Sequence, residues 1–577
     1  MLRRIVTMIA ATSLLSVLLP LVAAAETPAA QGANCEEFDV TGFSICGEFL
    51  EFWNANGGLP VFGYPLTDAF EEKNPDTGQT YLVQYFERQR FELHPENHGT
   101  VYAVLFGRLG AQILDMQGRD WRTFPTASPD AEHYFAVTGH AIAPMFWGYW
   151  SSHGLDFGDE GISFRESLML FGYPLSEPMM ELNLDGDTVL TQWFERAVFE
   201  YHPDNPAGQQ ILLRRAGAEL LAPPVESEVI ATGLHDPRGL TVTSDGTIYV
   251  AEAGTGGDQC LTLGEGEEAA EICFGQTGSV AEISDGTVTR VATDLPSLNF
   301  GEGATGPQDV VVGDMGQVYV VVGLGADPAM RAGVAAQIGE WANSFGTIAL
   351  VGDGGDWSSI ADVSQYETDA NPAGGPYDSN PYSLVLTESG FIVSDAGMNA
   401  VLGVHPGVDE TTFEELAVFE NTMVDAPPFL GLPPGTQIPM EPVPTGINQG
   451  SDGAYYVGEL TGFPFVPGAA MVWRVPGGGE ATVVADGFTN VIDVAFDSHG
   501  NMYVLEINKG GLLNANPDDP TTAVGALIKV TPDGHKTTVM TNGLVMPTGM
   551  AIGPDDAIYI SNFGVVPGMG QVIKVTP

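Results

Sequence analysis

The sequence predicts a mainly β fold: a six-bladed β-propeller over residues 227–577, preceded by two small α+β repeat modules. A short phrase recurs six times in residues 227–577, and a different phrase occurs twice before residue 222. The composition is rich in turn formers, with 73 Gly and 40 Pro in 577 residues. One such unit cannot bury both of its faces alone, so repetition on this scale is typical of a radially repeated β fold.

Each copy of the propeller phrase predicts a turn, a hydrophobic strand, a tight turn and a second strand that enters a Gly-rich loop. The copies begin at residues 235, 306, 380, 443, 490 and 546. The last copy ends in a third strand, residues 571–577, with no fourth strand after it. Residues 228–234 are similar to the expected outer strands 290–295 and 482–488. We therefore expect 228–234 to complete the last blade and close the ring, which places a domain boundary near Pro223 and Pro224.

Two blades carry insertions. Residues 327–345 have apolar side chains at helical spacing and predict a short helix. Residues 362–382 are rich in Asp, Asn, Pro and Gly and predict a long loop, for which a functional role is favoured.

The two modules, residues 35–120 and 133–222, share a Gly-Tyr-Pro-Leu-Thr/Ser turn at 63–67 and 172–176. Aromatic residues at helical spacing precede each turn, and alternating strands follow it, so each module predicts a short helix, a turn and a hairpin. Trp53, Trp150 and Trp193 have two interpretations. They form the core of each module, which is favoured, or they are exposed and stack on sugar rings.

The Gly-Tyr-Pro-Leu-Thr/Ser turn resembles the LGFP repeat of bacterial cell-envelope proteins. The resemblance implies attachment to the cell wall, with a wall glycan as the partner of the modules.

Residues 1–25 are interpreted as a cleaved signal peptide, because Arg3 and Arg4 precede an apolar run that ends in Ala23, Ala24 and Ala25. We expect a secreted, cell-surface or periplasmic protein with no transmembrane segment in the mature chain. The four cysteines agree with an oxidising compartment and predict two short-loop disulfides. These are Cys35–Cys46 and Cys260–Cys273.

The charge pattern excludes one class of partner. The formal charge is −54, from 74 acidic and 20 basic side chains. Binding phosphates needs clustered Lys and Arg, so we expect no nucleic-acid partner. An acidic surface suits solubility or the binding of cations.

Residues just past the second strands are expected to meet at one mouth of the propeller channel. We predict a small-molecule or protein ligand site there, formed by Arg238, Asp378, Asn380, Asp395, Asn399, Glu459, Glu506 and Asn562. Converging carboxylates need a cation or protons, and oxygen ligands suit Ca²⁺. The candidate calcium ligands are Glu252, Asp395, Glu459 and Glu506, a set similar to the metal site of lactonase propellers; Gly323 is the neutral exception. Alternatively, each acid binds backbone amides of neighbouring blades.

The string GELTGFPF at 458–465, together with DSNPY at 378–382 and DAGMN at 395–399, resembles the ScyD/ScyE family of exported propellers. That family is related to NHL-repeat and TolB-like propellers, and the resemblance covers essentially all of residues 227–577. It implies a role in assembling an indolic-phenolic pigment outside the cytoplasm, and it transfers no catalytic residue. The N-terminal modules depart from the members of that pathway.

Two functions follow from these patterns. The favoured one is an exported binding or scaffold protein, whose propeller binds at the channel mouth while the modules tether it to the cell envelope. The alternative is a calcium-dependent hydrolase or lactonase, or a pigment-pathway catalyst. The sequence contains no catalytic motif such as G-x-S-x-G or H-E-x-x-H, and no base–nucleophile pair is visible, so we lean against an enzyme without excluding one.

Overall fold

The structure is a computed structural model that describes residues 34–117, 119–222, 225–263, 270–301, 303–408, 410–516, 522–566 and 568–576. The predicted signal peptide, residues 1–25, and the predicted boundary at 223–224 lie outside the described residues. The fold is mainly antiparallel β, as predicted, and the chain divides into two compact units between Gly107 and Arg108. None of the helices in the described ranges is long and apolar enough to cross a membrane.

The first unit contains a hairpin, two short helices and a sheet. The hairpin pairs β1 (Cys35–Phe38) with β2 (Phe43–Cys46) and carries the predicted disulfide between Cys35 and Cys46. The helices are α1 (Gly47–Ala55), as the aromatic spacing predicts, and α2 (Gly58–Phe62). The predicted hairpin is the centre of a four-stranded sheet, β3 (Phe70–Lys73), β4 (Thr80–Tyr85), β5 (Arg90–Leu93) and β6 (Val104–Phe106), with η1 (Pro95–Asn97) after β5.

The second unit begins with a comparable arrangement. Its sheet has the order β12-β11-β10-β9, formed by β9 (Met179–Leu182), β10 (Thr188–Trp193), β11 (Val198–Tyr201) and β12 (Ile211–Leu213). Around it lie α3 (Leu109–Met116), η2 (Trp121–Thr123), β7 (Tyr134–Phe135), β8 (His140–Ala141), α4 (Pro144–Ser152), α5 (Phe164–Phe171) and α6 (Ala216–Leu221). Trp193 and the unpredicted helix α3 share one hydrophobic cluster. Trp53, Trp150 and Trp193 are buried, which confirms their interpretation as core residues.

In the described part of residues 226–576, six antiparallel sheets repeat one pattern. We number these sheets 1 to 6 in the chain order of their first strands. Sheet 1 is β14 (Pro237–Val242), β15 (Ile248–Glu252), β17 (Ala270–Ser284) and β18 (Thr287–Asn299), extended by β16 (Gln259–Leu263) and β19 (Ala304–Thr305). Sheet 2 is β20 (Pro307–Val312), β21 (Val318–Val322), β22 (Thr347–Val351) and β23 (Trp357–Asp362).

The remaining sheets follow in chain order. Sheet 3 is β24 (Pro381–Thr387), β25 (Gly390–Asp395), β26 (Ala400–His405) and β27 (Thr412–Val418). Sheet 4 is β30 (Pro444–Gln449), β31 (Tyr455–Glu459), β32 (Ala470–Val475) and β33 (Thr482–Phe488). Sheet 5 is β34 (Val491–Phe496), β35 (Met502–Glu506), β36 (Ala526–Val530) and β37 (Lys536–Met540). Sheet 6 is β38 (Gly549–Ile552), β39 (Ile558–Asn562), β40 (Gly570–Thr576) and β13 (Glu226–Leu234).

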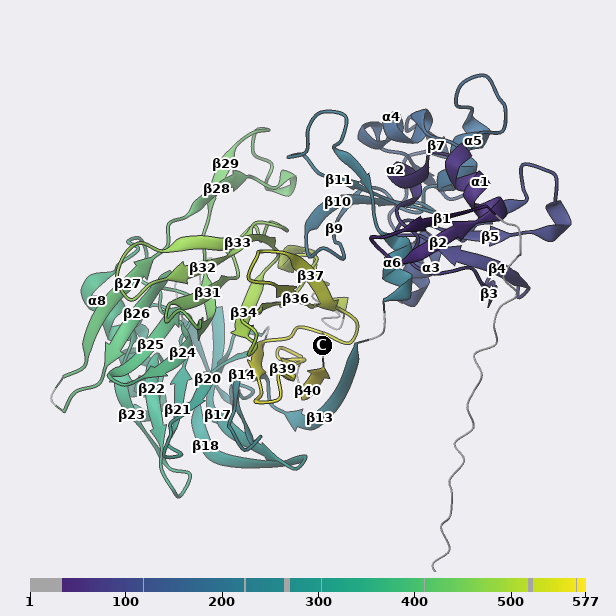
Figure 1. Cartoon of the computed structure of the whole chain (residues 1–577). Helices are drawn as coiled ribbons and strands as arrows, with labels where there is room; N and C mark the ends of the chain where they lie inside the picture. Colours follow the sequence, from purple (N-terminus) through teal and green to yellow (C-terminus); the bar gives the residue numbers. More distant parts are fainter. Residues whose placement is uncertain are drawn as a thin grey trace, which may run out of the picture. The chain divides into compact units, whose positions relative to one another are not determined.

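The first strands form a closed ring. Each of β14, β20, β24, β30, β34 and β38 contacts the next, and β38 contacts β14. Figure 1 shows β14, β20 and β24 near the axis of this ring and β18, β23 and β27 at its periphery. This is the propeller fold that the sequence predicts. Strand β13 pairs with β40 from Glu226 to Leu234, so the predicted closure of the ring by the N-terminal strand is confirmed.

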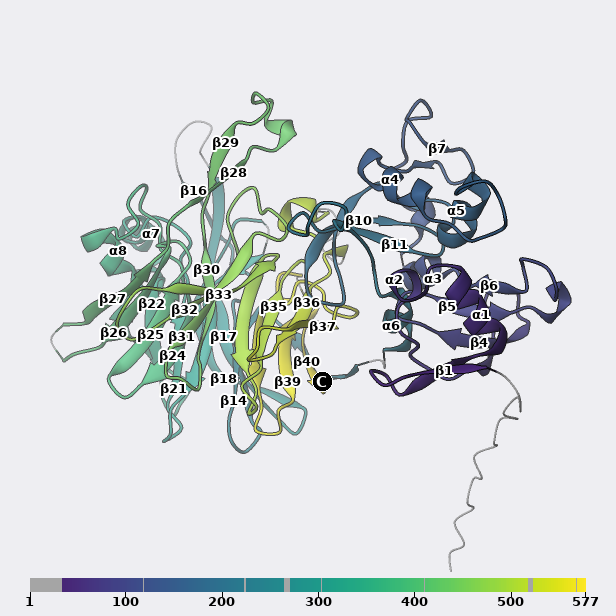
Figure 2. The same cartoon turned by 45° about the horizontal axis from the view of Figure 1, so that its top comes forward.

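The insertions differ in part from the predictions. The expected helix is α7 (Met330–Ile338), followed by η4 (Glu340–Ser344). The stretch predicted as a long loop begins instead with α8 (Ser364–Ala370), because its Asn, Pro and Gly residues come only after residue 370 and Tyr366 packs on Phe413. A hairpin of β28 (Thr422–Asp425) and β29 (Gln437–Met440), with η5 (Pro428–Leu430) near its tip, was not predicted and extends away from the sheets (Figure 2). One more short helix, η6 (Leu512–Asn514), follows β35.

The second predicted disulfide is also present. Cys260 and Cys273 are directly opposite in the β16–β17 pair and form a disulfide. Both cysteine predictions are therefore confirmed.

Candidate functional site

The first strands of the six sheets surround a cavity of about 290 Å³. Its wall includes residues of β14, β20, β24, β30, β34 and β38. Two acidic side chains line it, Asp309 from β20 and Asp493 from β34. These two strands stand three positions apart in a ring of six, so the two carboxylates come from opposite sides of the channel.

Asp309 bridges sheets 2 and 3. Its Oδ1 accepts a hydrogen bond from the N–H of Val310 at 2.8 Å. Its Oδ2 accepts bonds from the Ser383 hydroxyl at 2.7 Å and from the N–H of Leu384 at 3.1 Å. One oxygen therefore bonds within its own strand and the other bonds to the first strand of the next sheet.

Asp493 repeats this pattern between sheets 5 and 6. Its Oδ1 accepts from the N–H of Val494 at 2.8 Å, and its Oδ2 accepts from the N–H of Met550 at 2.6 Å. The two aspartates are therefore related by an approximate two-fold arrangement across the channel. Within the described residues, both carboxylates keep lone pairs that no donor uses, because each oxygen can accept two bonds.

Glycine on the preceding sheet makes room for each carboxylate. A Cβ atom added to Gly239 would lie 2.2 Å from Oδ1 of Asp309, and one added to Gly446 would lie 2.1 Å from Oδ1 of Asp493. These glycines and the two aspartates occupy the same position of the repeated phrase. In chain order that position holds Gly239, Asp309, Ser383, Gly446, Asp493 and Gly549.

Burial makes both carboxylates hard to ionise. It raises the pKa of Asp309 to about 6. Burial, together with the charge of Asp309, raises the pKa of Asp493 well above its usual range. Within the described residues, the groups that act on these two side chains include no Lys, Arg or His. Two like charges in a desolvated channel favour a bound proton or a bound cation.

The acids that were predicted as calcium ligands are not brought together. Among the described residues, the one set of three His, Cys, Asp or Glu side chains with ligand atoms within 4.8 Å of one another is Cys260, Glu271 and Cys273. Both of its sulfur atoms are in a disulfide. The four predicted ligands, Glu252, Asp395, Glu459 and Glu506, therefore do not form a shared site of this kind.

Glu252 is fully buried, and both of its carboxylate oxygens accept hydrogen bonds. Its Oε1 accepts from the N–H of His235 at 2.7 Å and from Nη2 of Arg290 at 2.9 Å. Its Oε2 accepts from the Ser279 hydroxyl at 2.6 Å and from Nε of Arg290 at 2.9 Å. The Arg290 guanidinium is thus bound in a bidentate manner, which uses the planar geometry of both groups.

The other predicted residues make a related bond to the segment that enters a first strand. The accepting side chains and donating N–H groups are Asp395 and Asn380 (2.7 Å), Glu506 and Thr489 (2.6 Å), Asn562 and Val545 (2.8 Å), and Asn399 and Val443 (3.0 Å). Asn399 bonds to the neighbouring sheet, and the other three bond within their own sheet. This agrees with the interpretation that these side chains satisfy backbone amides, a requirement for buried N–H groups.

Glu459 and Arg238 also have protein partners. Burial raises the pKa of Glu459 to about 7, and its Oε2 accepts a bond from Nε1 of Trp473 at 3.2 Å. The Arg238 guanidinium donates to the carbonyl oxygens of Gly564 at 2.5 Å and Ala304 at 2.6 Å. Arg238 therefore joins the ends of neighbouring sheets.

Asn380 explains the neutral exception at Gly323. Its Oδ1 accepts a bond from the N–H of Leu324 at 3.2 Å and lies 2.5 Å from where a Cβ of residue 323 would be. A longer side chain at 323 would collide with it. Asp378, two residues earlier, is exposed.

Comparison with known proteins gives distant structural likenesses. No family model matches the chain, and no curated protein matches it either. A gluconolactonase from Xanthomonas campestris is similar with a TM-score of 0.36 and 9% identity, over 62% of this chain and 93% of that one. Regucalcin from Agrobacterium tumefaciens, titled a calcium-binding protein, is similar with a TM-score of 0.34 and 13% identity, over 61% and 95%.

A virginiamycin B lyase from Staphylococcus aureus is similar with a TM-score of 0.31 and 14% identity, over 70% of this chain and 98% of that one. All three likenesses are too distant to carry an argument about activity or ligand.

Sequence reasoning missed the paired aspartates. Asp309 and Asp493 lie inside the repeated phrases that predicted the first strands. The available signal was that only the second and fifth of six copies have an acid at the position of the phrase that holds Gly239 in the first copy. Two copies that are three apart in a six-membered ring face one another.

The burial of Glu506 leads us to expect that the stability of the protein depends on pH. Burial raises its pKa to about 8, and its Oε2 is buried without a hydrogen-bond partner in the described residues. A pKa raised by folding means that its contribution to stability is complete below the unfolded-state value and is lost as the pH rises toward 8. Glu506→Gln keeps an acceptor for the N–H of Thr489 and removes the charge. We expect the variant to match the wild type at pH 5 and to exceed its free energy of unfolding at pH 9 by about 1–2 kcal/mol.

The measurement is urea denaturation at pH 5 and pH 9 in the presence of EDTA. Glu228→Gln, at an exposed position of β13, is the control and should leave the pH profile unchanged. Parallel profiles for wild type and Glu506→Gln would contradict the assignment.

Proposed function

We propose that this chain is an exported binding protein whose propeller channel holds a divalent cation, Ca²⁺, between Asp309 and Asp493. The observation that carries the proposal is the pair of carboxylates that line the channel from opposite first strands, with no cationic side chain acting on either among the described residues. A cation between them would offset the charge of Asp309, which together with burial raises the pKa of Asp493.

The chemistry of the cavity wall suits a hard cation. Ca²⁺ takes six to eight oxygen ligands from carboxylates, carbonyl or amide oxygens, hydroxyls and water. Besides the two aspartates, the wall contains the Ser383 hydroxyl and the Asn448 amide. A cavity of about 290 Å³ also has space for several water molecules, since a water occupies roughly 30 Å³ of liquid. This proposal keeps the predicted cation and assigns it to different residues.

The N-terminal part has a separate role in the proposal. The LGFP-like modules tether the exported chain to the cell envelope, and the ScyD/ScyE-like propeller presents its channel outside the cytoplasm. The two disulfides, Cys35–Cys46 and Cys260–Cys273, support an oxidising location. Sedimentation of the full chain with purified cell-envelope fragments tests the tether. A chain that stays in the supernatant contradicts it.

Calcium binding is tested by isothermal titration of the full chain at pH 7.5 after treatment with EDTA. We expect saturable binding and a rise of the thermal midpoint with Ca²⁺, because a ligand that binds only the folded state stabilises it. Asp493→Asn should abolish the heat of binding. Asp555→Asn, at a surface ion pair with Lys574, should not change it.

Two outcomes contradict the proposal. One is a wild-type thermal midpoint that is the same in Ca²⁺ and in EDTA, with no heat of binding. The other is equal Ca²⁺ affinity in the wild type and in Asp493→Asn, which would place the cation elsewhere.

A further inference from the structure

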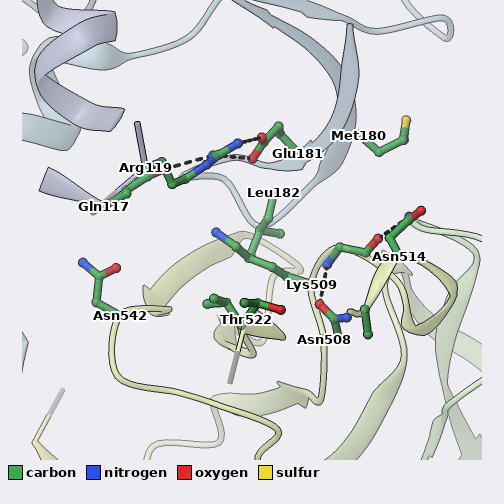
Figure 3. A pocket seen from close by; sticks show the side chains of 13 residues that line it. Gln117, Arg119, Met180, Glu181, Leu182, Asn508, Lys509, Asn514, Thr522 and Asn542 are labelled. Atoms are coloured by element: carbon green, nitrogen blue, oxygen red, sulfur yellow. Dashed lines mark hydrogen bonds and ion pairs between the residues drawn. The ribbon is translucent and has the colours of Figure 1, made fainter. Parts of the chain in front are cut away.

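A second cavity of about 290 Å³ lies within the second unit, between the β9–β10 hairpin and sheet 5. Strand β9 contributes Met180, Glu181 and Leu182 to its wall, and the loop after β35 contributes Lys509. Figure 3 shows the Lys509 side chain reaching between the Arg119–Glu181 pair and Asn542. This cavity is separate from the channel and from every residue of the proposed calcium site.

The walls of the cavity are held together by specific bonds. The N–H of Thr538 donates to the carbonyl oxygen of Leu184 at 2.9 Å, and its hydroxyl donates to that of Asn183 at 2.7 Å. Lys536 forms an ion pair with Asp187 in the same turn. Leu182 belongs to a hydrophobic cluster with residues of β32, β34 and β36. The hairpin is therefore packed on sheet 5, and the space beside it is a formed pocket.

The cations around the cavity differ in how closely they are paired. Arg119 donates two hydrogen bonds to Glu181, at 2.5 Å and 3.2 Å. Arg214 donates two bonds to Glu219, at 2.8 Å and 3.2 Å. The Lys509 ammonium has no hydrogen-bond or ion-pair partner among the described residues. Among the described residues, each nearby guanidinium thus has a carboxylate at hydrogen-bond distance, whereas the Lys509 ammonium has none.

This arrangement costs stability in the absence of a ligand. Burial lowers the pKa of Lys509, against the opposing effect of Glu181. A desolvated charge without a partner is unfavourable, and natural proteins keep such groups mainly where they bind or react. The lysine is therefore better explained by something that it binds than by the fold.

We propose that this cavity binds a small hydroxylated monocarboxylate, such as a sugar acid, whose carboxylate pairs with the ammonium of Lys509. A single unpaired cation matches a single negative charge. A phosphate dianion would bring a second charge next to Glu181, and both arginines that could receive it are already paired.

The rest of the wall suits the body of such a ligand. The amides of Gln117 and Asn542 can exchange hydrogen bonds with hydroxyl groups, and Met180 and Leu182 offer apolar surface to C–H groups. The volume is near the lower end of the range for ligand pockets, so the site holds about one monosaccharide unit. Together these features favour one sugar acid over a polymer segment or an apolar ligand.

The test is isothermal titration of the full chain with D-glucuronate in EDTA, which keeps it independent of calcium binding. We expect saturable binding to the wild type and none of uncharged D-glucose. Lys509→Met should weaken glucuronate binding about tenfold or more, as expected for loss of a charge-assisted bond. Lys574→Met removes the same charge outside the cavity, from a surface ion pair, and should bind like the wild type.

The same variants provide a readout that does not depend on the ligand. Lys509→Met should have a thermal midpoint equal to or above that of the wild type, because it removes a half-buried charge that has no ion pair among the described residues. A lower midpoint would overturn the argument by giving the lysine a structural role. Absence of glucuronate binding, equal binding by Lys509→Met, or tighter binding of inorganic phosphate would each overturn the proposed ligand class.

Discussion

Glu252→Ala is expected to lower the free energy of unfolding by about 3 kcal/mol, toward the low end of the range for breaking a buried ion pair. Glu252 is fully buried, while the side chain of its partner Arg290 keeps a third of its surface exposed, and this exposure moderates the effect. The substitution removes four acceptor contacts at once. It leaves the guanidinium without a counterion and the N–H of His235 without its bond.

The position of this pair explains why the effect should reach the whole ring. Arg290 also donates to the carbonyl oxygen of Gly233, which lies in the closing strand β13, and His235 directly follows that strand. Glu252 therefore holds the junction between the strand that completes sheet 6 and the first strand of sheet 1. We expect an earlier loss of the β13–β40 pairing, measurable by hydrogen exchange of the β13 amides.

The control for Glu252→Ala is Asp555→Ala, which breaks the surface ion pair with Lys574. Exposed pairs of this kind contribute about 0–1 kcal/mol, so the control should remain close to the wild type. Urea denaturation of both variants provides the comparison. A loss below about 1 kcal/mol in Glu252→Ala would contradict the role of the pair in ring closure.

The propeller and its closure could be predicted because both depend on patterns within short segments of the sequence. Each phrase contains a whole hairpin. The outer-strand pattern of residues 228–234 is recognisable from its own residues, without knowledge of the strand that pairs with it. Helix α8 escaped prediction because Gly and Pro dominate the second half of its segment, whereas Tyr366 packs against a distant ring. Tertiary packing of this kind is invisible in a single window of sequence.

The candidate sites were harder to predict for a related reason. Acids at strand ends were expected to converge, yet most of them bond to an N–H group of their own sheet, as Asp395 does with Asn380. A buried N–H needs an acceptor, and these side chains supply it. No sequence pattern indicates a site at Lys509, because its neighbours in the cavity include Arg119 and Glu181, which are far away in the sequence.

The second large effect is expected at the channel, where Gly446→Ala should destabilise the propeller by about 2–3 kcal/mol. The new Cβ would lie 2.1 Å from Oδ1 and 2.6 Å from Cα of Asp493, so the backbone of β34 has to move. Such a shift pulls Oδ2 away from the N–H of Met550 and loosens the contact between sheets 5 and 6.

Gly477→Ala is a matched control in the same sheet, because a Cβ there meets nothing within 4 Å and the residue has no positive φ. Thermal and urea denaturation should separate the two variants clearly, and calcium titration should show a weaker affinity for Gly446→Ala alone. Equal stability of both variants would mean that the channel can widen without cost. The same result would remove the reason for glycine beside each aspartate, since a Cβ at Gly239 meets Asp309 in the same way.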